Sequence, residues 1–322
     1  MSVPGASTTT PAFPIRLVAL DLDGTLVDDG LELRERTIAA VGAAVSRGVS
    51  VSIVTGRMTT SALRFARRLG LVDPMVGYQG AIIRSMPTAD DGRLGRLLLH
   101  RPLEAAATRE AIRYSRSIGL SPHVNHLEKF IIGADDPRID DYSAWFGGRA
   151  VLVQDLAAAI RRPVSKVISV GEEPIPHDVL DTARACFDGR AEVTVSHPRF
   201  LEFLRPGVSK GVAVAWLARR ARVPLANTLA IGDQFNDVEM ITAVGHGAAM
   251  PHAPAPVRAI ARYIAPPLHE EGAAQLIEQL VLADPRSAAE ASARLAAEAD
   301  AARDEAAVGH GARHVTSLPA TA

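Results

Sequence analysis

The first part of the chain alternates between short apolar runs and stretches with helical periodicity. Five of the six residues in 15–20 are apolar, and further apolar runs cover 49–54 and 75–76. Helical patterns fill the intervals at 34–47 and 58–69. Continuous apolar strands separated by helices are typical of parallel sheets that are buried on both faces. We therefore predict βαβ units in an α/β core.

The pattern changes after residue 83, where strands and helices no longer alternate one for one. We interpret residues 84–204 as a separate α+β domain inserted into the core. Its expected elements are hairpins at 84–100, strands at 123–133, 166–170 and 200–204, and helices at 103–118 and 177–187.

The strand and helix alternation returns after residue 205. Ser209 is placed to cap a helix that begins at Lys210. The fold class predicted from the whole pattern is α/β, with a Rossmann-like doubly wound parallel sheet as core and an inserted α+β cap domain. The expected elements of the second core part are helices at 210–222, 238–244 and 272–282 and strands at 228–231, 247–250 and 263–264.

Both ends of the chain lack the pattern of a packed domain. The start mixes small polar residues with prolines and is predicted to be a flexible lead without function. The end is rich in alanine and charge without a clear apolar stripe, which predicts a solvated helix or a disordered tail. The predicted organisation is a lead at 1–14, core at 15–83, cap at 84–204, core at 205–283 and tail at 284–322.

Composition narrows the classes of partner. The 322 residues include 35 Lys plus Arg and 36 Asp plus Glu, so the net charge of −1 favours neither nucleic acid nor an anionic membrane as partner. Cys186 is the single cysteine, which fits a reducing compartment, and we expect a cytoplasmic protein. No apolar run approaches the roughly 20 residues of a membrane span. The composition is also compatible with a homodimer of this chain.

Acidic residues follow two of the predicted core strands. Asp21 and Asp23 end the first strand, and Asp233 and Asp237 follow the strand at 228–231. Because parallel strands end at one edge of the sheet, these carboxylates are expected to converge there. Oxygen ligands of this kind favour Mg²⁺. The alternative for Asp21 and Asp23 is an ordinary turn, since Asp and Gly are common turn residues.

Other residues at the same edge are suited to an anion. Thr55 offers a hydroxyl in a glycine-containing turn, and Lys210 lies in the first turn of a helix, where the dipole favours negative charge. A phosphate could therefore be held from two sides. The alternatives are a solvated surface lysine at Lys210 and an ordinary helix-start residue at Thr55.

Four motifs in this order resemble those of haloacid-dehalogenase-superfamily phosphatases. The insert resembles the large α/β cap of the Cof-type branch, subfamily IIB, as do Gly80-Ala81 and Glu271-Gly272. The resemblance covers roughly residues 15–283 and is specific, because four motifs agree in order and spacing. The motifs are Asp21-Leu22-Asp23-Gly24-Thr25-Leu26, Thr55-Gly56-Arg57, Ser209-Lys210-Gly211 and Gly232-Asp233-Gln234-Phe235-Asn236-Asp237.

The resemblance implies a Mg²⁺-dependent phosphatase that forms an aspartyl phosphate. Asp21 would be the nucleophile, and Asp23 would be the general acid and then the general base. Asp233, Asp21 and the backbone carbonyl of Asp23 would hold Mg²⁺, with Asp237 supporting it directly or through water. The groups that would bind the phosphoryl oxygens are Thr55, Gly56, Lys210 and Asn236.

Two positions depart from the family pattern, which commonly has Asn at Gln79 and Gly-Asn-Ala at Met250-Pro251-His252-Ala253. We expect neither to touch the proposed chemistry, with His252 capping a turn, but both are expected on loops that face the substrate or the cap and so bear on substrate identity. Specificity is expected to come from the cap. Its polar cluster His123, Asn125, His126 and Lys129 is the first candidate for leaving-group contacts, and the alternative is a solvated hairpin face.

The function expected from these patterns is hydrolysis of a small phosphorylated metabolite such as a sugar phosphate. A phosphomutase of the same fold is the nearest alternative, and it would turn a bisphosphate intermediate around instead of admitting water. A noncatalytic phosphometabolite-binding protein is the alternative from another class. A dinucleotide-binding oxidoreductase is disfavoured, because no G-x-G-x-x-G follows the first strand.

Overall fold

The computed structural model describes residues 11–88, 93–136, 150–172 and 174–311, with side chains up to residue 303. Its core is a parallel five-stranded sheet in the order β14-β13-β12-β1-β2. These strands are β1 (Leu17–Leu20), β2 (Ser50–Ile53), β12 (Thr228–Gly232), β13 (His246–Ala249) and β14 (Tyr263–Ile264).

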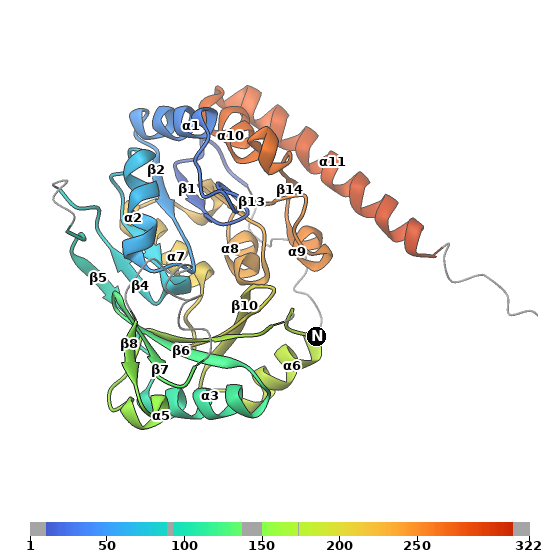
Figure 1. The fold of residues 1–322 in the computed structure, drawn as a ribbon. Coiled ribbons are helices and arrows are strands. Elements are labelled where there is room, and N and C mark those ends of the chain that lie inside the picture. Colours follow the sequence, from blue (N-terminus) through green and yellow to red (C-terminus); the bar gives the residue numbers. More distant parts are fainter. Residues whose placement is uncertain (1–10, 89–92, 137–149, 173, 312–322) are drawn as a thin grey trace, which may run out of the picture.

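Helices cover both faces of this sheet (Figure 1). Val18 and Leu20 of β1 belong to the hydrophobic core under α1 (Glu35–Ser46), α10 (Gly272–Ile277) and part of α2 (Thr59–Arg68). Leu17 and Ala19 point to the opposite core, under α7 (Lys210–Ala221), α8 (Val238–Ala243) and α9 (Ala255–Ile260). An apolar strand without alternation is therefore buried on both sides, and the predicted doubly wound core is confirmed.

A small antiparallel sheet leads from the core into the insert. It contains β3 (Met75–Gly77), β4 (Ile82–Arg84) and β5 (Leu97–His100), in that order. The turn between β3 and β4 is the short helix η1 (Tyr78–Gly80), in which Tyr78 and Gln79 have positive φ. This turn lies close to the carboxyl edge of the core sheet, since the N–H of Gln79 donates to the carbonyl of Thr55.

The cap is built on a six-stranded sheet in the order β10-β11-β9-β6-β7-β8. The helices α3 (Ala105–Ser117), α5 (Leu156–Ala159) and α6 (His177–Cys186) cover the sheet face turned away from the core (Figure 1). The other face is open toward the core. The strands are β6 (Ser121–His126), β7 (Lys129–Gly133), β8 (Val151–Val153), β9 (Lys166–Val170), β10 (Glu192–His197) and β11 (Phe200–Leu204).

Four local elements were not expected from the sequence, namely the strands β8 and β10 and the helices α5 and α9. β8, α5 and α9 are too short to carry a repeat that distinguishes them from a loop. The strand β10 forms because it pairs antiparallel with β11. The last two residues of β10, Ser196 and His197, line the cavity between the cap and the core.

The two chain ends differ from the predictions in the parts that the structure describes. Residues 1–10 and 312–322 lie outside the described residues, but 11–14 pack against the core, with the Ala12 N–H donating to the Ala226 carbonyl. The tail forms α11 (Pro285–Gly311), which packs against β14. The predicted helix is therefore confirmed for 285–311, whereas a solvated helix is wrong for its described side chains, because an apolar stripe is buried. It consists of Ala288, Ala291, Leu295 and Ala299.

No helix within the described part of the chain is long and apolar enough to cross a bilayer. The longest, α11, carries charged residues along its exposed side.

Candidate active site

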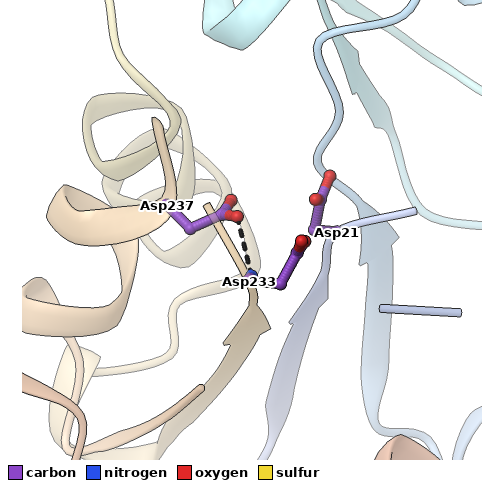
Figure 2. A group of neighbouring side chains, drawn as sticks. All are labelled: Asp21, Asp233 and Asp237. Atoms are coloured by element: carbon purple, nitrogen blue, oxygen red, sulfur yellow. Dashed lines mark hydrogen bonds between the residues drawn. The ribbon is translucent and has the colours of Figure 1, made fainter. Parts of the chain in front are cut away.

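The candidate site lies where the strand order of the core sheet reverses, on either side of β1. From β1 the chain passes to β2 on one side, while β12 lies on the other side of β1. The loops that leave β1 and β12 therefore diverge and open a crevice at the carboxyl edge of the sheet. Asp21 follows β1 directly and Asp233 follows β12, so both predicted acids enter this crevice (Figure 2).

Three carboxylates meet at this edge. One oxygen from each of Asp21, Asp233 and Asp237 lies within 4.8 Å of the others, and all three residues are buried. Asp237 ends the short helix η3 (Phe235–Asp237), and its Oδ2 accepts the backbone N–H groups of Asp233 and Gln234, each at 3.0 Å. These hydrogen bonds within the loop after β12 hold it in a compact turn, in which Asp233 and Asp237 both face Asp21 (Figure 2).

Lys210 lies between the acids and is fully buried. Its Nζ is 2.7 Å from Asp21 Oδ1 and 2.6 Å from Asp237 Oδ1. The helix α7 begins at this residue, and the Ser209 hydroxyl caps it by accepting the Val212 N–H at 3.2 Å, as predicted. The alternative of a solvated surface lysine is therefore wrong. Burial opposes the lysine charge, but the two carboxylates outweigh it and raise the pKa of Lys210.

The charge balance of this group calls for a further cation. Burial, followed by the Asp237 carboxylate, raises the pKa of Asp21 well above its usual value, although Lys210 acts in the opposite direction. Burial likewise raises the pKa of Asp237. Three carboxylates against one ammonium leave excess negative charge away from water, which is costly unless a cation or a proton binds. An all-oxygen donor set of this kind fits a hard divalent ion such as Mg²⁺.

A close turn holds Asp233 against the first loop. Gly24 has φ +76°, and a Cβ there would lie 2.5 Å from Asp233 Oδ2, so only glycine allows this approach. The Thr25 hydroxyl donates to Asp233 Oδ1 at 3.3 Å. The conformation of the Asp-Gly-Thr turn is therefore part of the acidic site.

The Asp23 carboxylate has a different partner from the other acids. Arg57 grips it with two hydrogen bonds, Nε to Oδ2 at 2.7 Å and Nη2 to Oδ1 at 2.5 Å. The Asp23 side chain is half-exposed at 49%. The side chain of Asp23 thus lies outside the three-acid group, and the predicted contact of Asp23 with a metal concerned only its backbone carbonyl. Sequence reasoning did not single out Arg57, whose partner is 34 residues away.

The predicted anion-binding residues come together beside Asp21. Thr55 is buried, and its hydroxyl accepts the Arg57 N–H at 3.2 Å. It does not start a helix, because α2 begins four residues later. A Cβ at Gly56 would lie 2.4 Å from Gln79 Nε2, so the Gln79 side chain packs directly against this glycine. Asn236 lies in η3 and donates from Nδ2 to Gln79 Oε1 at 2.9 Å.

A cavity of about 740 Å³ connects these groups with the cap. Its core wall includes Asp21, Asp23, Thr55, Gly56 and Asn236. This volume is in the range of sites for small ligands. The cap wall comes from the open face of its sheet, namely Asn125, Lys166, Ile168, Ser196, His197, Arg199, Phe200 and Glu202.

The proteins that this chain resembles identify the family. A family model described as haloacid dehalogenase-like hydrolase matches residues 18–277. The chain belongs to this family.

Relatives of this haloacid dehalogenase-like hydrolase include proteins named as phosphatases. It is 29% identical over 242 residues to the HMP-PP phosphatase of Cronobacter sakazakii, covering 74% of this chain and 85% of that protein. It is 27% identical over 271 residues to the 5-amino-6-(5-phospho-D-ribitylamino)uracil phosphatase YitU of Bacillus subtilis, covering 82% of this chain and 96% of that protein.

Solved structures share the fold at lower identity. A haloacid dehalogenase-like hydrolase from Bacteroides thetaiotaomicron superposes with a TM-score of 0.69 at 24% identity, over 82% of this chain and 99% of that one. A sugar phosphatase of HAD subclass IIB superposes with a TM-score of 0.71 at 19% identity, over 82% of this chain and 98% of that one. The predicted Cof-type fold with an inserted cap is confirmed.

Two residues that depart from the family pattern touch the site, contrary to prediction. His252 Nε2 lies 3.5 Å from Asp233 Oδ2, and the residue lines the cavity. The hydrogen bond with Asp233 raises the pKa of His252. Gln79 is buried between the core and the cap, in contact with Asn236 and Glu202. A one-dimensional pattern could not reveal these contacts, because they join residues far apart in the chain.

The predicted cap cluster is divided by the structure. Asn125 lines the cavity, whereas the buried His123 packs edge-on against Phe130 and does not line it. His126 is partly buried and Lys129 is exposed. The alternative of a solvated hairpin face therefore holds for Lys129 and is wrong for His123 and Asn125, because β6 is an interior strand of the cap sheet.

Proposed function

We propose that this hydrolase is a Mg²⁺-dependent phosphoric monoester hydrolase acting on a small phosphorylated metabolite through an aspartyl phosphate on Asp21. The observation that carries the proposal is the position of Asp21. Its carboxylate lies between the Lys210 ammonium and Asp233, at the floor of the cavity that the cap covers. The names of the curated relatives support phosphatase chemistry on a small metabolite.

The residues divide the reaction into two displacements. The Asp21 carboxylate oxygen attacks phosphorus, the bond from phosphorus to the leaving oxygen breaks, and Asp23 gives that oxygen a proton. Asp23 then takes a proton from water, whose oxygen attacks phosphorus and releases inorganic phosphate from Asp21. Its half-exposed carboxylate is suited to this exchange, and Arg57 holds it in place.

The remaining polar groups bind and orient the phosphoryl group. Lys210 stabilises the ionised form of Asp21 and is placed to contact a phosphoryl oxygen. Thr55, Gly56 and Asn236 line the same floor and would bind the other oxygens. Mg²⁺, held by Asp21, Asp233, the backbone carbonyl of Asp23 and Asp237 directly or through water, would supply positive charge against the charge that develops on phosphate. Asp237 also fixes Lys210.

Phosphate release from a panel of phosphorylated metabolites tests this function. We expect turnover that needs Mg²⁺, stops with EDTA and falls roughly 10³-fold or more in Asp21→Asn, which keeps the shape but removes the nucleophile. Asp188→Asn, an exposed cap carboxylate, is the matched control and should retain full activity. An Asp21→Asn protein with undiminished turnover would contradict the assignment. Turnover that depends on an added bisphosphate would instead favour a phosphomutase.

A further inference from the structure

A buried ion pair lies on the open face of the cap sheet, directly above the candidate phosphate site. Lys166 of β9 and Glu202 of β11 are joined by Nζ to Oε2 at 2.9 Å, and each side chain is only 2% exposed. Glu202 Oε1 also accepts the Ser196 hydroxyl at 2.5 Å. Both of these partners donate to the Glu202 carboxylate.

The first link from this pair to the core runs through Lys166. Its Nζ donates to the backbone carbonyl of Gly56 at 2.9 Å, across the boundary between cap and core. This carbonyl belongs to the same peptide unit as the Arg57 N–H, which donates to the Thr55 hydroxyl. Because a peptide unit is planar, the cap lysine fixes the orientation of both groups of the candidate phosphate loop.

The second link runs through Gln79. Its Nε2 donates to Glu202 Oε2 at 3.3 Å, and its Oε1 accepts from Asn236 Nδ2 at 2.9 Å. The Gln79 backbone has φ 58°, a left-handed conformation that is uncommon for glutamine. Its long side chain is thus held in place to bridge Glu202 of the cap and Asn236 of the core.

Stability alone does not account for a buried pair at this place. The cap and the core each have their own hydrophobic cluster. A buried ion pair contributes little net stability compared with apolar residues of similar volume, since both charges lose their water. Burial lowers the pKa of Lys166, while Glu202 acts against that shift. What the pair adds is a fixed geometry between two domains.

We propose that Lys166, Glu202 and Gln79 are positioning residues that make the phosphate affinity of the core loops depend on the seating of the cap. This inference rests on the proposed function only in taking the loops of Gly56 and Asn236 as phosphate contacts. Because these links meet the phosphate loops and not the leaving group, their loss weakens binding of every phosphate compound, including inorganic phosphate.

Calorimetric binding of inorganic phosphate in the presence of Mg²⁺ tests the proposal without requiring turnover. We expect Lys166→Met and Gln79→Asn to weaken phosphate binding by roughly tenfold, the loss expected for one or two hydrogen bonds. Asn tolerates positive φ better than Gln does, so Gln79→Asn is expected to keep or raise the melting temperature while its shorter side chain breaks the bridge. If Gln79 had a purely structural role, Gln79→Asn would instead lower the melting temperature.

Another polar contact between cap and core supplies the matched control. Glu128 accepts the Thr59 hydroxyl at 2.5 Å and pairs with Arg84 at 3.1 Å, and it does not line the cavity. Glu128→Gln should lower the melting temperature and leave phosphate affinity within about twofold. If Lys166→Met fails to fold, Gln79→Asn gives the answer alone. Unchanged phosphate affinity in Gln79→Asn, or no phosphate binding by the wild type, overturns the proposal.

The same variants separate this inference from the proposed function. Wild-type protein that binds phosphate but hydrolyses no ester would contradict the phosphatase assignment and leave the positioning role standing. Hydrolysis of p-nitrophenyl phosphate that falls in Lys166→Met together with phosphate affinity supports both. A loss confined to bulky substrates would show that Lys166 contacts the leaving group instead, and would overturn the positioning role.

Discussion

At the scale of single residues, the pairing of Asp23 with Arg57 is the feature of the site with the clearest chemical consequence. Two parallel hydrogen bonds between a guanidinium and a carboxylate fix both the position and the plane of the acid. The Arg57 side chain is itself only 20% exposed, so it moves little. The Asp23 carboxylate is thereby held at the wall of the cavity while it remains accessible to water.

Removal of Arg57 should therefore reduce the rate more than the binding of substrate. We expect Arg57→Leu to lower kcat about tenfold with little change in KM, because the Asp23 carboxylate loses its orientation. Arg57→Lys should recover only part of the rate, since an ammonium cannot make the paired contact. Steady-state kinetics on one small phosphate ester measures both variants. A rise in KM at constant kcat would show that Arg57 binds the substrate instead.

At the scale of secondary structure elements, the helix α11 completes the core. Leu295 and Ala291 join the hydrophobic cluster that lies under α1 and α10. The hydroxyl of Tyr263 in β14 is hydrogen-bonded to the Ser292 hydroxyl of this helix at 2.6 Å. The helix thus covers the edge strand β14, which would otherwise expose apolar surface.

Shortening the central apolar side chain of α11 tests this packing. We expect Leu295→Ala to lower the free energy of unfolding by about 2–4 kcal/mol, since a buried leucine is replaced by a cavity. Arg294→Ala, at the neighbouring exposed position, should change it by about 0.5 kcal/mol or less. Urea denaturation of both variants gives the comparison. Equal effects would mean that α11 does not pack on the core in solution.

At the scale of the whole molecule, buried histidines make stability depend on pH. Burial, followed by nearby Lys166, lowers the pKa of His123 to about 3. Burial also lowers the pKa of His246 to about 4, although its bond to the Ala12 carbonyl opposes this. Below about pH 6.5 the unfolded chain binds protons on these histidines that the folded chain does not. Stability is therefore expected to fall as the pH drops from about 6.5 toward 4.

The size of this effect can be measured by urea denaturation at about pH 7 and about pH 5. Each histidine should contribute about 1–2 kcal/mol to the loss of unfolding free energy. His246→Gln should reduce the difference between the two pH values, whatever its effect on absolute stability. The variant with the exposed His269 replaced by glutamine is the control. A pH dependence that is the same in His246→Gln and the wild type would contradict the assignment.

The sequence by itself determined the core and the residues next to its strands. Asp21 and Asp233 could be placed because each directly follows an apolar run, and a parallel sheet gathers the ends of its strands at one edge. The position of Lys210 followed from the Ser209 cap, which marks where the helix begins. These inferences depend only on neighbours in the chain, which local periodicity records.

Only the tertiary structure decided which polar groups pair at the site. His252 meets Asp233 and Arg57 meets Asp23 because the core loops fold together, and Glu202 of β11 meets Gln79 because the cap packs on the core. No periodic pattern encodes such pairs, since each joins residues that are brought together only by the fold. The buried stripe of α11 was missed for a related reason, because alanines carry little hydrophobic signal until a neighbouring surface covers them.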